Sequence, residues 1–135
     1  MTKYLTPKST LAKILATVAE DPQALCRVPD RYMISKVFLE AVSSFGWALQ
    51  YVPEELKTYE VCLTAVKDFS QSIYEVPEEH LTYEICLIAV QENGANLSQV
   101  PPKHRTPEMC LAAISICPEA IRWSPYSILE LMSMK

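Results

Sequence analysis

The sequence predicts an all-α chain: an α-solenoid of about five short-helix/long-helix repeats with a C-terminal capping helix. The first observation is a Val-Pro pair that recurs with a spacing of 24 residues, at Val28-Pro29, Val52-Pro53, Val76-Pro77 and Val100-Pro101. The second is a leucine that recurs at the same spacing, at Leu15, Leu39, Leu63, Leu87 and Leu111. Self-similarity at a period of this size is typical of repeat arrays. We expect the 135 residues to form one domain, residues 1–135.

The long helix of each copy is best seen in the third copy. Its apolar residues recur at helical spacing, at Cys62, Leu63, Val66 and Phe69. This pattern predicts an amphipathic helix from about Tyr59 to Asp68, with these four residues on its buried face. The hydroxyl of Thr58 can cap the first turn, and Thr82 and Thr106 repeat the signal in later copies. The first long helix is expected over Thr10 to Glu20.

A shorter helix fits between each long helix and the next Val-Pro, because the residue before a proline avoids the α region. Its buried side is expected to consist of the pairs Ala24-Leu25, Ala48-Leu49, Ser72-Ile73, Asn96-Leu97 and Ala120-Ile121. Gly46 and Gly94, the only glycines in the sequence, lie at the corner between the two helices. We expect a positive φ there. Pro125 to Met134 is predicted to form the closing helix, with Ile128, Leu129 and Met132 covering the last repeat.

The repeated residues also carry a resemblance. The pattern V-P-E-E-L-x-T-x-E-x-C-L-x-A-V runs from Val52 to Val66 and again, with Leu81 shifted, from Val76 to Val90. It resembles a bacterial repeat family that is classed as a domain of unknown function. The resemblance covers roughly Pro22 to Pro125 and implies tandem short-helix/long-helix units in bacterial proteins, some of them secreted effectors. Since the family has no established activity, the resemblance implies a fold and no mechanism.

Composition makes several classes of function poor candidates. The net charge of −4 disfavours nucleic acid as a partner, because a phosphate backbone would be repelled. No apolar run approaches the roughly 18 to 20 residues that cross a bilayer, so we expect no membrane partner. No secretory signal is recognisable, and five cysteines, an odd number, favour a reducing compartment. We therefore expect a cytoplasmic protein, either in a bacterium or in the host cytosol if it is a secreted effector.

The residues that usually carry chemistry do not converge in the predicted array. Cys62, Cys86 and Cys110 share one repeat position, but stacked helices lie about 8 to 10 Å apart, too far for thiolates that share a zinc ion. We expect buried core thiols. His80 and His104 also share one position and are expected to be partly covered turn residues. We thus expect no catalytic residue, no metal and no cofactor. The alternative is an enzyme of unknown class that uses His80, His104 and the turn carboxylates.

A surface feature is the best candidate for function. Carboxylates of successive turns and helix starts are expected to form an acidic stripe, with tyrosines beside it, made of Glu54, Glu55, Tyr59, Glu60, Glu78, Glu79, Tyr83 and Glu84, and continued by Glu108 at the next helix start. The stripe either keeps the array soluble or binds a basic segment of another protein. Trp47, Tyr51, Tyr74 and Trp123, in or next to the short helices, are further candidates for recognition. Ile88, Ala112 and Ile116 are a possible contact face for a partner or for a second copy of the chain. A third hypothesis for the function is a purely structural or antitoxin-like partner role.

Overall fold

The computed structural model describes Leu5 and residues 9–133, and these residues contain helices and no strand. The prediction of an all-α chain is confirmed. The long helices have ten residues each and begin at intervals of 24 residues: α1 (Leu11–Glu20), α2 (Ser35–Ser44), α3 (Tyr59–Asp68), α4 (Tyr83–Glu92) and α5 (Pro107–Ile116). A last helix, α6, spans Ile128–Ser133. None of the described helices has the length and apolar character that crossing a bilayer requires.

Each long helix is followed by a six-residue 3₁₀ helix that ends before a Val-Pro or Ser-Pro pair. These are η1 (Pro22–Arg27), η3 (Gly46–Tyr51), η5 (Ser70–Glu75), η7 (Gly94–Gln99) and η9 (Pro118–Trp123). A single 3₁₀ turn precedes the later long helices: η2 (Asp30–Tyr32), η4 (Glu54–Leu56), η6 (Glu78–His80) and η8 (Pro102–His104). We call each succession of one-turn helix, long helix and short helix a unit. The repeat pattern predicted only a turn where the one-turn helices lie.

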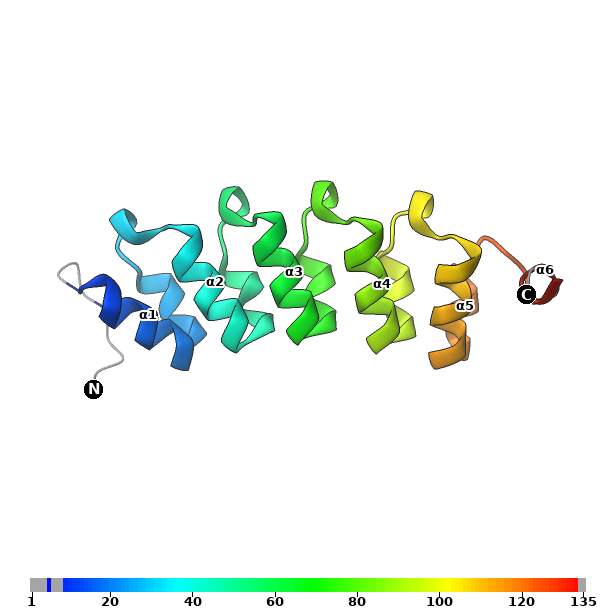
Figure 1. Cartoon of the computed structure of the whole chain (residues 1–135), viewed down its shortest axis with the longest axis horizontal. Helices are drawn as coiled ribbons and strands as arrows, with labels where there is room; N and C mark the ends of the chain where they lie inside the picture. Colours follow the sequence, from blue (N-terminus) through cyan, green and yellow to red (C-terminus); the bar gives the residue numbers. More distant parts are fainter. Residues whose placement is uncertain (1–4, 6–8, 134–135) are drawn as a thin grey trace.

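The units lie side by side in a row, from α1 near one end of the molecule to α6 at the other (Figure 1). Each long helix packs against the next, and each short helix packs against the long helix of its own unit. Short helices η3, η5 and η7 also contact one another in succession. The one-turn helices lie along the upper edge in this view, away from the contacts between long and short helices (Figure 1).

The start of α3 agrees with the prediction, since Thr58 caps it by accepting a hydrogen bond of 3.2 Å from the Val61 N–H. Its buried face differs from the prediction. Val61 and Cys62 are buried, whereas Leu63 is only partly covered and Phe69 is 40% exposed. Helical spacing placed Phe69 in the core, but its φ of −143° is extended. The helix therefore ends before Phe69, and the ring leaves the buried stripe.

The prediction of a positive φ at Gly46 and Gly94 is wrong, because neither glycine has one. Glycine is needed there for space. A Cβ on Gly46 would lie 2.5 Å from the carbonyl oxygen of Ala65 and 2.8 Å from the Cβ of Phe69. A Cβ on Gly94 would likewise overlap the carbonyl oxygen of Ala113. The start of the short helix thus touches the backbone of the next long helix, and only a residue without a side chain fits.

The closing helix is shorter than predicted and buries a different side. Ser127 and Glu130 form a capping box, in which each backbone N–H donates to the other's side chain, at 2.9 and 3.1 Å. This box sets the start of α6 at Ile128. Leu131 is buried, while Leu129 is 78% exposed, and Ile128 and Met132 are exposed as well. The predicted covering face of Ile128, Leu129 and Met132 is therefore wrong, and Met134 lies outside the described residues.

Candidate functional site

The three cysteines that share a repeat position, Cys62, Cys86 and Cys110, are buried and make no disulfide. This confirms the prediction of core thiols. Burial raises the pKa of Cys62 and of Cys86 to about 11, so both are neutral near pH 7. Among the described residues no group of three or more His, Cys, Asp or Glu side chains could hold a metal ion.

His80 and His104 are partly buried, as predicted, and each packs on a tyrosine of the preceding unit. The ring centroids of His80 and Tyr59 lie 6.3 Å apart, and those of His104 and Tyr83 lie 6.1 Å apart, both in edge-on geometry. The structure therefore places each histidine in a contact between units, with an aromatic ring as its neighbour.

The two tyrosines of the predicted site link successive units through their hydroxyls. The Tyr59 hydroxyl donates a hydrogen bond of 2.6 Å to Glu84 and lies 3.2 Å from the Thr82 hydroxyl. The bond to Glu84 raises the pKa of Tyr59. The Tyr83 hydroxyl lies 3.1 Å from the Thr106 hydroxyl in the same way. Tyr59 and Glu84 are thus brought together, but the tyrosines join units and offer only part of their surface to a partner.

The carboxylates of the predicted stripe are all exposed, and we call the six that lie in the units of α3 and α4 the acidic edge. Four project from successive one-turn helices, Glu54 and Glu55 from η4 and Glu78 and Glu79 from η6. Those helices lie along one edge of the molecule (Figure 1). The other two, Glu60 and Glu84, lie in the first turns of α3 and α4. The one-turn helix of the next unit holds Lys103 in place of an acid, so the pairs of turn carboxylates end there, although Glu108 in the first turn of α5 is exposed as well.

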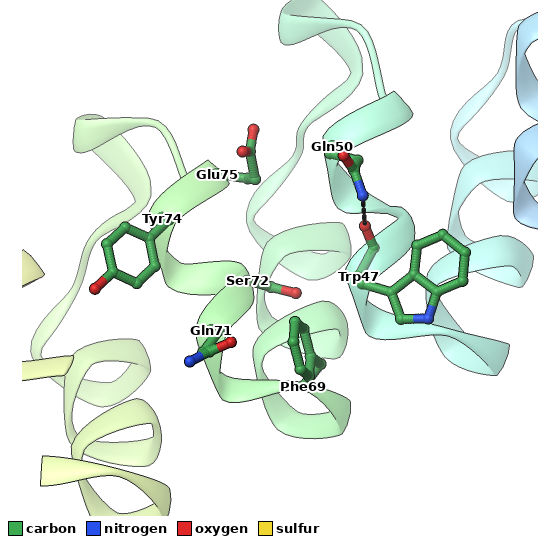
Figure 2. A pocket seen from close by; sticks show the side chains of 7 residues that line it. All are labelled: Trp47, Gln50, Phe69, Gln71, Ser72, Tyr74 and Glu75. Carbon is green, nitrogen blue, oxygen red and sulfur yellow. Dashed lines mark hydrogen bonds between the residues drawn. The ribbon is translucent and has the colours of Figure 1, made fainter. Parts of the chain in front are cut away.

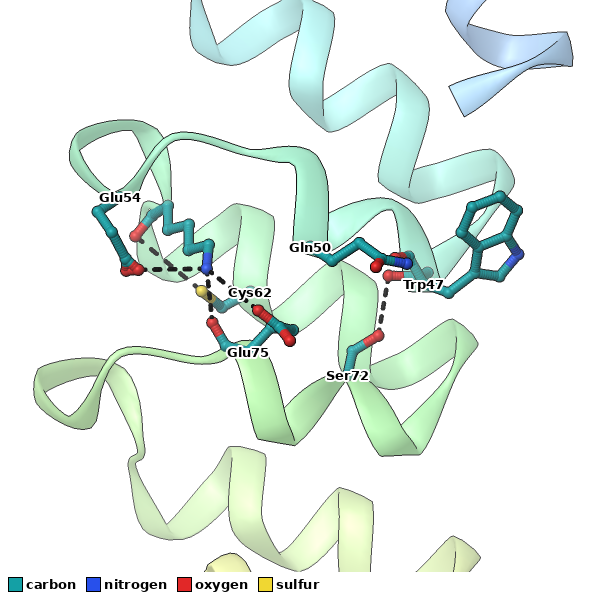
Figure 3. Close-up of polar contacts among 8 residues, drawn as sticks. Trp47, Gln50, Glu54, Cys62, Ser72 and Glu75 are labelled. Carbon is teal, nitrogen blue, oxygen red and sulfur yellow. Dashed lines mark hydrogen bonds and ion pairs between the residues drawn. The ribbon is translucent and has the colours of Figure 1, made fainter. Parts of the chain in front are cut away.

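Lys57 is a buried cation that the pattern did not single out. Its side chain is only 7% exposed, and its ammonium donates to Glu54 at 3.2 Å and to the carbonyl of Glu75 at 3.0 Å. The Glu75 carboxylate lies 3.7 Å away on the other side. Figure 3 shows Glu54 and Glu75, which come from η4 and η5. Two carboxylates therefore surround one ammonium, and the cluster keeps a net negative charge.

The equivalent position two units later holds Arg105, which caps η9 in the same way that Lys57 caps η5. Its guanidinium donates to the carbonyls of Trp123, at 2.9 Å, and of Val100, at 2.8 Å. Uncharged residues, Met33 and Leu81, occupy the equivalent positions of the two other units. Lys57 and Arg105 could have been found from the sequence by comparing this repeat position across the copies, because it is apolar in Met33 and Leu81 and charged in the other two.

A hollow of about 220 Å³ lies between η3 and η5, and we call it the aromatic groove. It is lined by Trp47, Gln50, Phe69, Gln71, Ser72, Tyr74 and Glu75. Figure 2 shows the side chains of Trp47 and Tyr74 at opposite ends, with those of Phe69, Gln71 and Ser72 between them. The three rings are large exposed hydrophobic groups. Trp47 and Tyr74 were among the predicted recognition aromatics, whereas Phe69 was not.

The other predicted surface residues are more covered. Tyr51 is partly buried and packs edge-on against Trp47, and Trp123 is partly buried under the guanidinium of Arg122, which is 5.6 Å from its ring. In the predicted apolar contact face Ile88 and Ala112 are partly buried, and Ile116 is exposed.

Residues 35–81 match a family that is described as a domain of unknown function, DUF4116. The matched span contains the aromatic groove, Lys57 and the four turn carboxylates of the acidic edge. It supports, for this part of the chain, the expected resemblance to a family of unknown function. No curated protein and no solved structure matches the chain.

Chemically, the described surfaces combine exposed charge with exposed aromatic rings. Exposed carboxylates attract cations, and exposed aromatic rings beside polar groups supply contact area. The acidic edge and the aromatic groove meet at Glu75, because Glu75 lines the groove and shares Lys57 with Glu54.

Proposed function

We propose that this chain is a protein–protein interaction module: an α-solenoid of tandem short-helix/long-helix repeats in which the acidic edge binds a basic segment of another protein. The observation that carries the proposal is the projection of Glu54, Glu55, Glu78 and Glu79 from successive one-turn helices. Units that stack in a row repeat such a feature at regular steps, and an extended chain has a similarly regular geometry. We assign the protein to the bacterial cytosol, or to the host cytosol if it is a secreted effector, because the resemblance is to bacterial proteins and an odd number of cysteines favours a reducing compartment.

The electrostatics support a cationic partner. The side chain of Glu54 is 69% exposed although it pairs with Lys57, and the carboxylates of Glu55, Glu78 and Glu79 are exposed too. Complementary charge steers association and fixes orientation more than it adds affinity. We therefore expect fast, salt-sensitive binding to lysine- and arginine-rich segments, and self-association is not part of the proposal.

The test is a charge reversal with a matched control. The edge variant changes Glu55, Glu78 and Glu79 to lysine and keeps Glu54, whose loss would disturb Lys57. The control variant changes Glu20, Glu40 and Glu92, which are exposed on the long helices, and so alters the net charge equally. Binding of a fluorescent nona-lysine peptide is measured at two salt concentrations.

We expect the edge variant to bind the peptide about tenfold more weakly than the control variant, a difference of about 1.4 kcal/mol. Equal losses in both variants would mean that only net charge matters and would overturn the proposal. The same pair of variants then discriminates a true partner in extracts of the native host, since a partner held by the acidic edge is captured by the control variant alone. An enzymatic activity that depends on His80 or His104, or action as a purely structural or antitoxin-like partner, would also argue against it.

A further inference from the structure

The aromatic groove departs from the repeat pattern of the chain. Trp47, Phe69 and Tyr74 line it with exposed rings. One unit later the equivalent positions hold Gln71, Asn93 and Ser98, which carry no ring. Exposed aromatic residues cost solubility, and the repeat architecture does not require them. Their concentration between one pair of short helices indicates a binding role for that place.

The groove is held in shape before any partner arrives. The Trp47 ring packs against Phe45 and Tyr51, with centroids 5.7 and 6.2 Å apart. The hydroxyl of Ser72 donates a hydrogen bond of 2.8 Å to the carbonyl of Gly46, which joins η5 to η3. A preformed groove binds with less loss of conformational entropy.

The charge at the groove points to a cation. Glu75 lines the groove with a side chain that is 46% exposed, and no lysine or arginine is among the lining residues. Lys57 does not neutralise Glu75 fully, because the ammonium also pairs with Glu54 at 3.2 Å. Gln50 donates its amide to the carbonyl of Trp47, which leaves its side-chain oxygen as an acceptor. The groove thus offers aromatic faces, a carboxylate and an amide oxygen together.

We propose that the aromatic groove binds an arginine side chain of the basic segment that the acidic edge attracts, so this inference rests on the proposed function. A guanidinium is planar, stacks on aromatic rings and pairs with a carboxylate through two parallel hydrogen bonds. A lysine ammonium is a point charge with strong hydration and makes the ring contact less well. The groove therefore supplies a preference for arginine, whereas the acidic edge accepts either cation.

The experiment uses Trp47 as its own reporter. The sequence has two tryptophans, so a Trp123→Phe background leaves Trp47 as the single one. The probes are nona-arginine and nona-lysine peptides, which carry equal charge, and a neutral proline-rich peptide. Affinities and Trp47 emission are measured for this background and after Phe69→Ala or Glu75→Gln. Glu20→Gln is the matched control, because it removes one exposed carboxylate from α1, a helix that contributes no residue to the groove. Circular dichroism checks that each variant is folded.

We expect nona-arginine to bind about fivefold or more tightly than nona-lysine and to shift Trp47 emission, in the range of a cation–π contact. Phe69→Ala and Glu75→Gln should each bring the ratio of the two affinities close to one, and Glu20→Gln should leave it unchanged. Equal affinities, or a preference for arginine that survives both groove variants, would overturn the inference. An emission shift with the proline-rich peptide alone would overturn it too.

The same titrations separate this inference from the proposed function. If both peptides bind equally and the edge reversal weakens both, the acidic edge stands and the groove proposal fails. If arginine binding needs Phe69 and Glu75 but survives the edge reversal, the groove stands and the acidic edge fails. If neither peptide binds, both fail.

Discussion

Asp68, the last residue of α3, accepts a hydrogen bond of 2.6 Å from the backbone N–H of Gly46, the first residue of η3 in the preceding unit. The first N–H groups of a helix lack partners within it, and a carboxylate is a strong acceptor for them. The same short helix start lies against the carbonyl oxygen of Ala65. Gly46 is therefore where one unit is fitted to the next, by a hydrogen bond and by close backbone contact.

Gly46→Ala should destabilise the protein by about 1 to 3 kcal/mol, the usual cost of overpacking a tight contact. The added methyl group would lie 2.5 Å from the Ala65 oxygen and force η3 away from α3. The control is Ser44→Ala, two residues earlier in the chain, where an exposed side chain ends α2. It should change the free energy of unfolding by less than about 0.5 kcal/mol. Urea denaturation followed by circular dichroism measures both, and equal stabilities of Gly46→Ala and the parent chain would show that the contact relaxes freely.

Asp68→Ala should cost about 1 kcal/mol, because it leaves the Gly46 N–H without its acceptor. Glu92 occupies the equivalent position one unit later and is exposed. Glu92→Ala removes the same charge without removing this hydrogen bond, so its free energy of unfolding should stay within about 0.5 kcal/mol of the parent value. A similar loss in both variants would assign the effect to charge and not to the bond with Gly46.

Lys57→Leu should change stability by less than about 1 kcal/mol, because a buried ion pair is often replaced by an apolar side chain of similar volume at little cost. Leu81 already occupies the equivalent position in the next unit. Lys57→Ala should cost about 2 kcal/mol or more, since it removes the buried stem and leaves a cavity. Chemical denaturation of the two variants decides between packing and charge: equal losses would mean that the contacts to Glu54 and Glu75 dominate.

Cys62 and Cys86 should resist iodoacetamide at pH 8, while the exposed Cys26 reacts readily. The reason is twofold: the thiols are buried, and their pKa of about 11 leaves little thiolate at that pH. Mass spectrometry of the modified peptides reads out the order of reaction. Early modification of Cys62 or Cys86 in the folded protein would contradict their burial.

The same pKa values set a pH dependence of stability. Folding raises each thiol pKa from 9.0 to about 11, so the folded state holds the proton more tightly than the unfolded state. The resulting stabilisation is complete below pH 9 and is lost as the pH rises towards 11. The double variant Cys62→Ala, Cys86→Ala should therefore lose less stability between pH 8 and pH 10.5 than the parent chain does. If the variant and the parent chain lost the same stability over this pH range, the raised pKa values of Cys62 and Cys86 would be contradicted.

Local signals in the sequence account well for the helices. Tyr59–Asp68 follows from apolar spacing and from the capping residue Thr58, both of which act within a few residues of the chain. Burial is less predictable, because it depends on neighbours from other units. Phe69 fits the helical spacing of the core, yet its extended backbone turns the ring towards solvent. Leu131 is likewise the covered residue of α6, since the capping box sets where that helix begins.

The candidate site, too, could be predicted only in part from the sequence. The exposed carboxylates of the acidic edge follow from their repeat positions, because a residue type that recurs at one position recurs on one surface. The aromatic groove does not follow, since Trp47 and Phe69 belong to successive units and meet only when those units pack. The spatial requirement at Gly46 is hidden for the same reason. A glycine in a sequence suggests a positive φ, whereas Gly46 has none and is needed because a side chain would not fit.

Lys57 and Arg105 have a consequence for which units can follow one another. Each donates to the backbone carbonyl of the last residue in the short helix of its own unit, Glu75 or Trp123. Met33 and Leu81 occupy the same position in other units. Because every residue supplies a backbone carbonyl, a unit that carries a cation at this position can follow any other unit without a matching side chain in its neighbour.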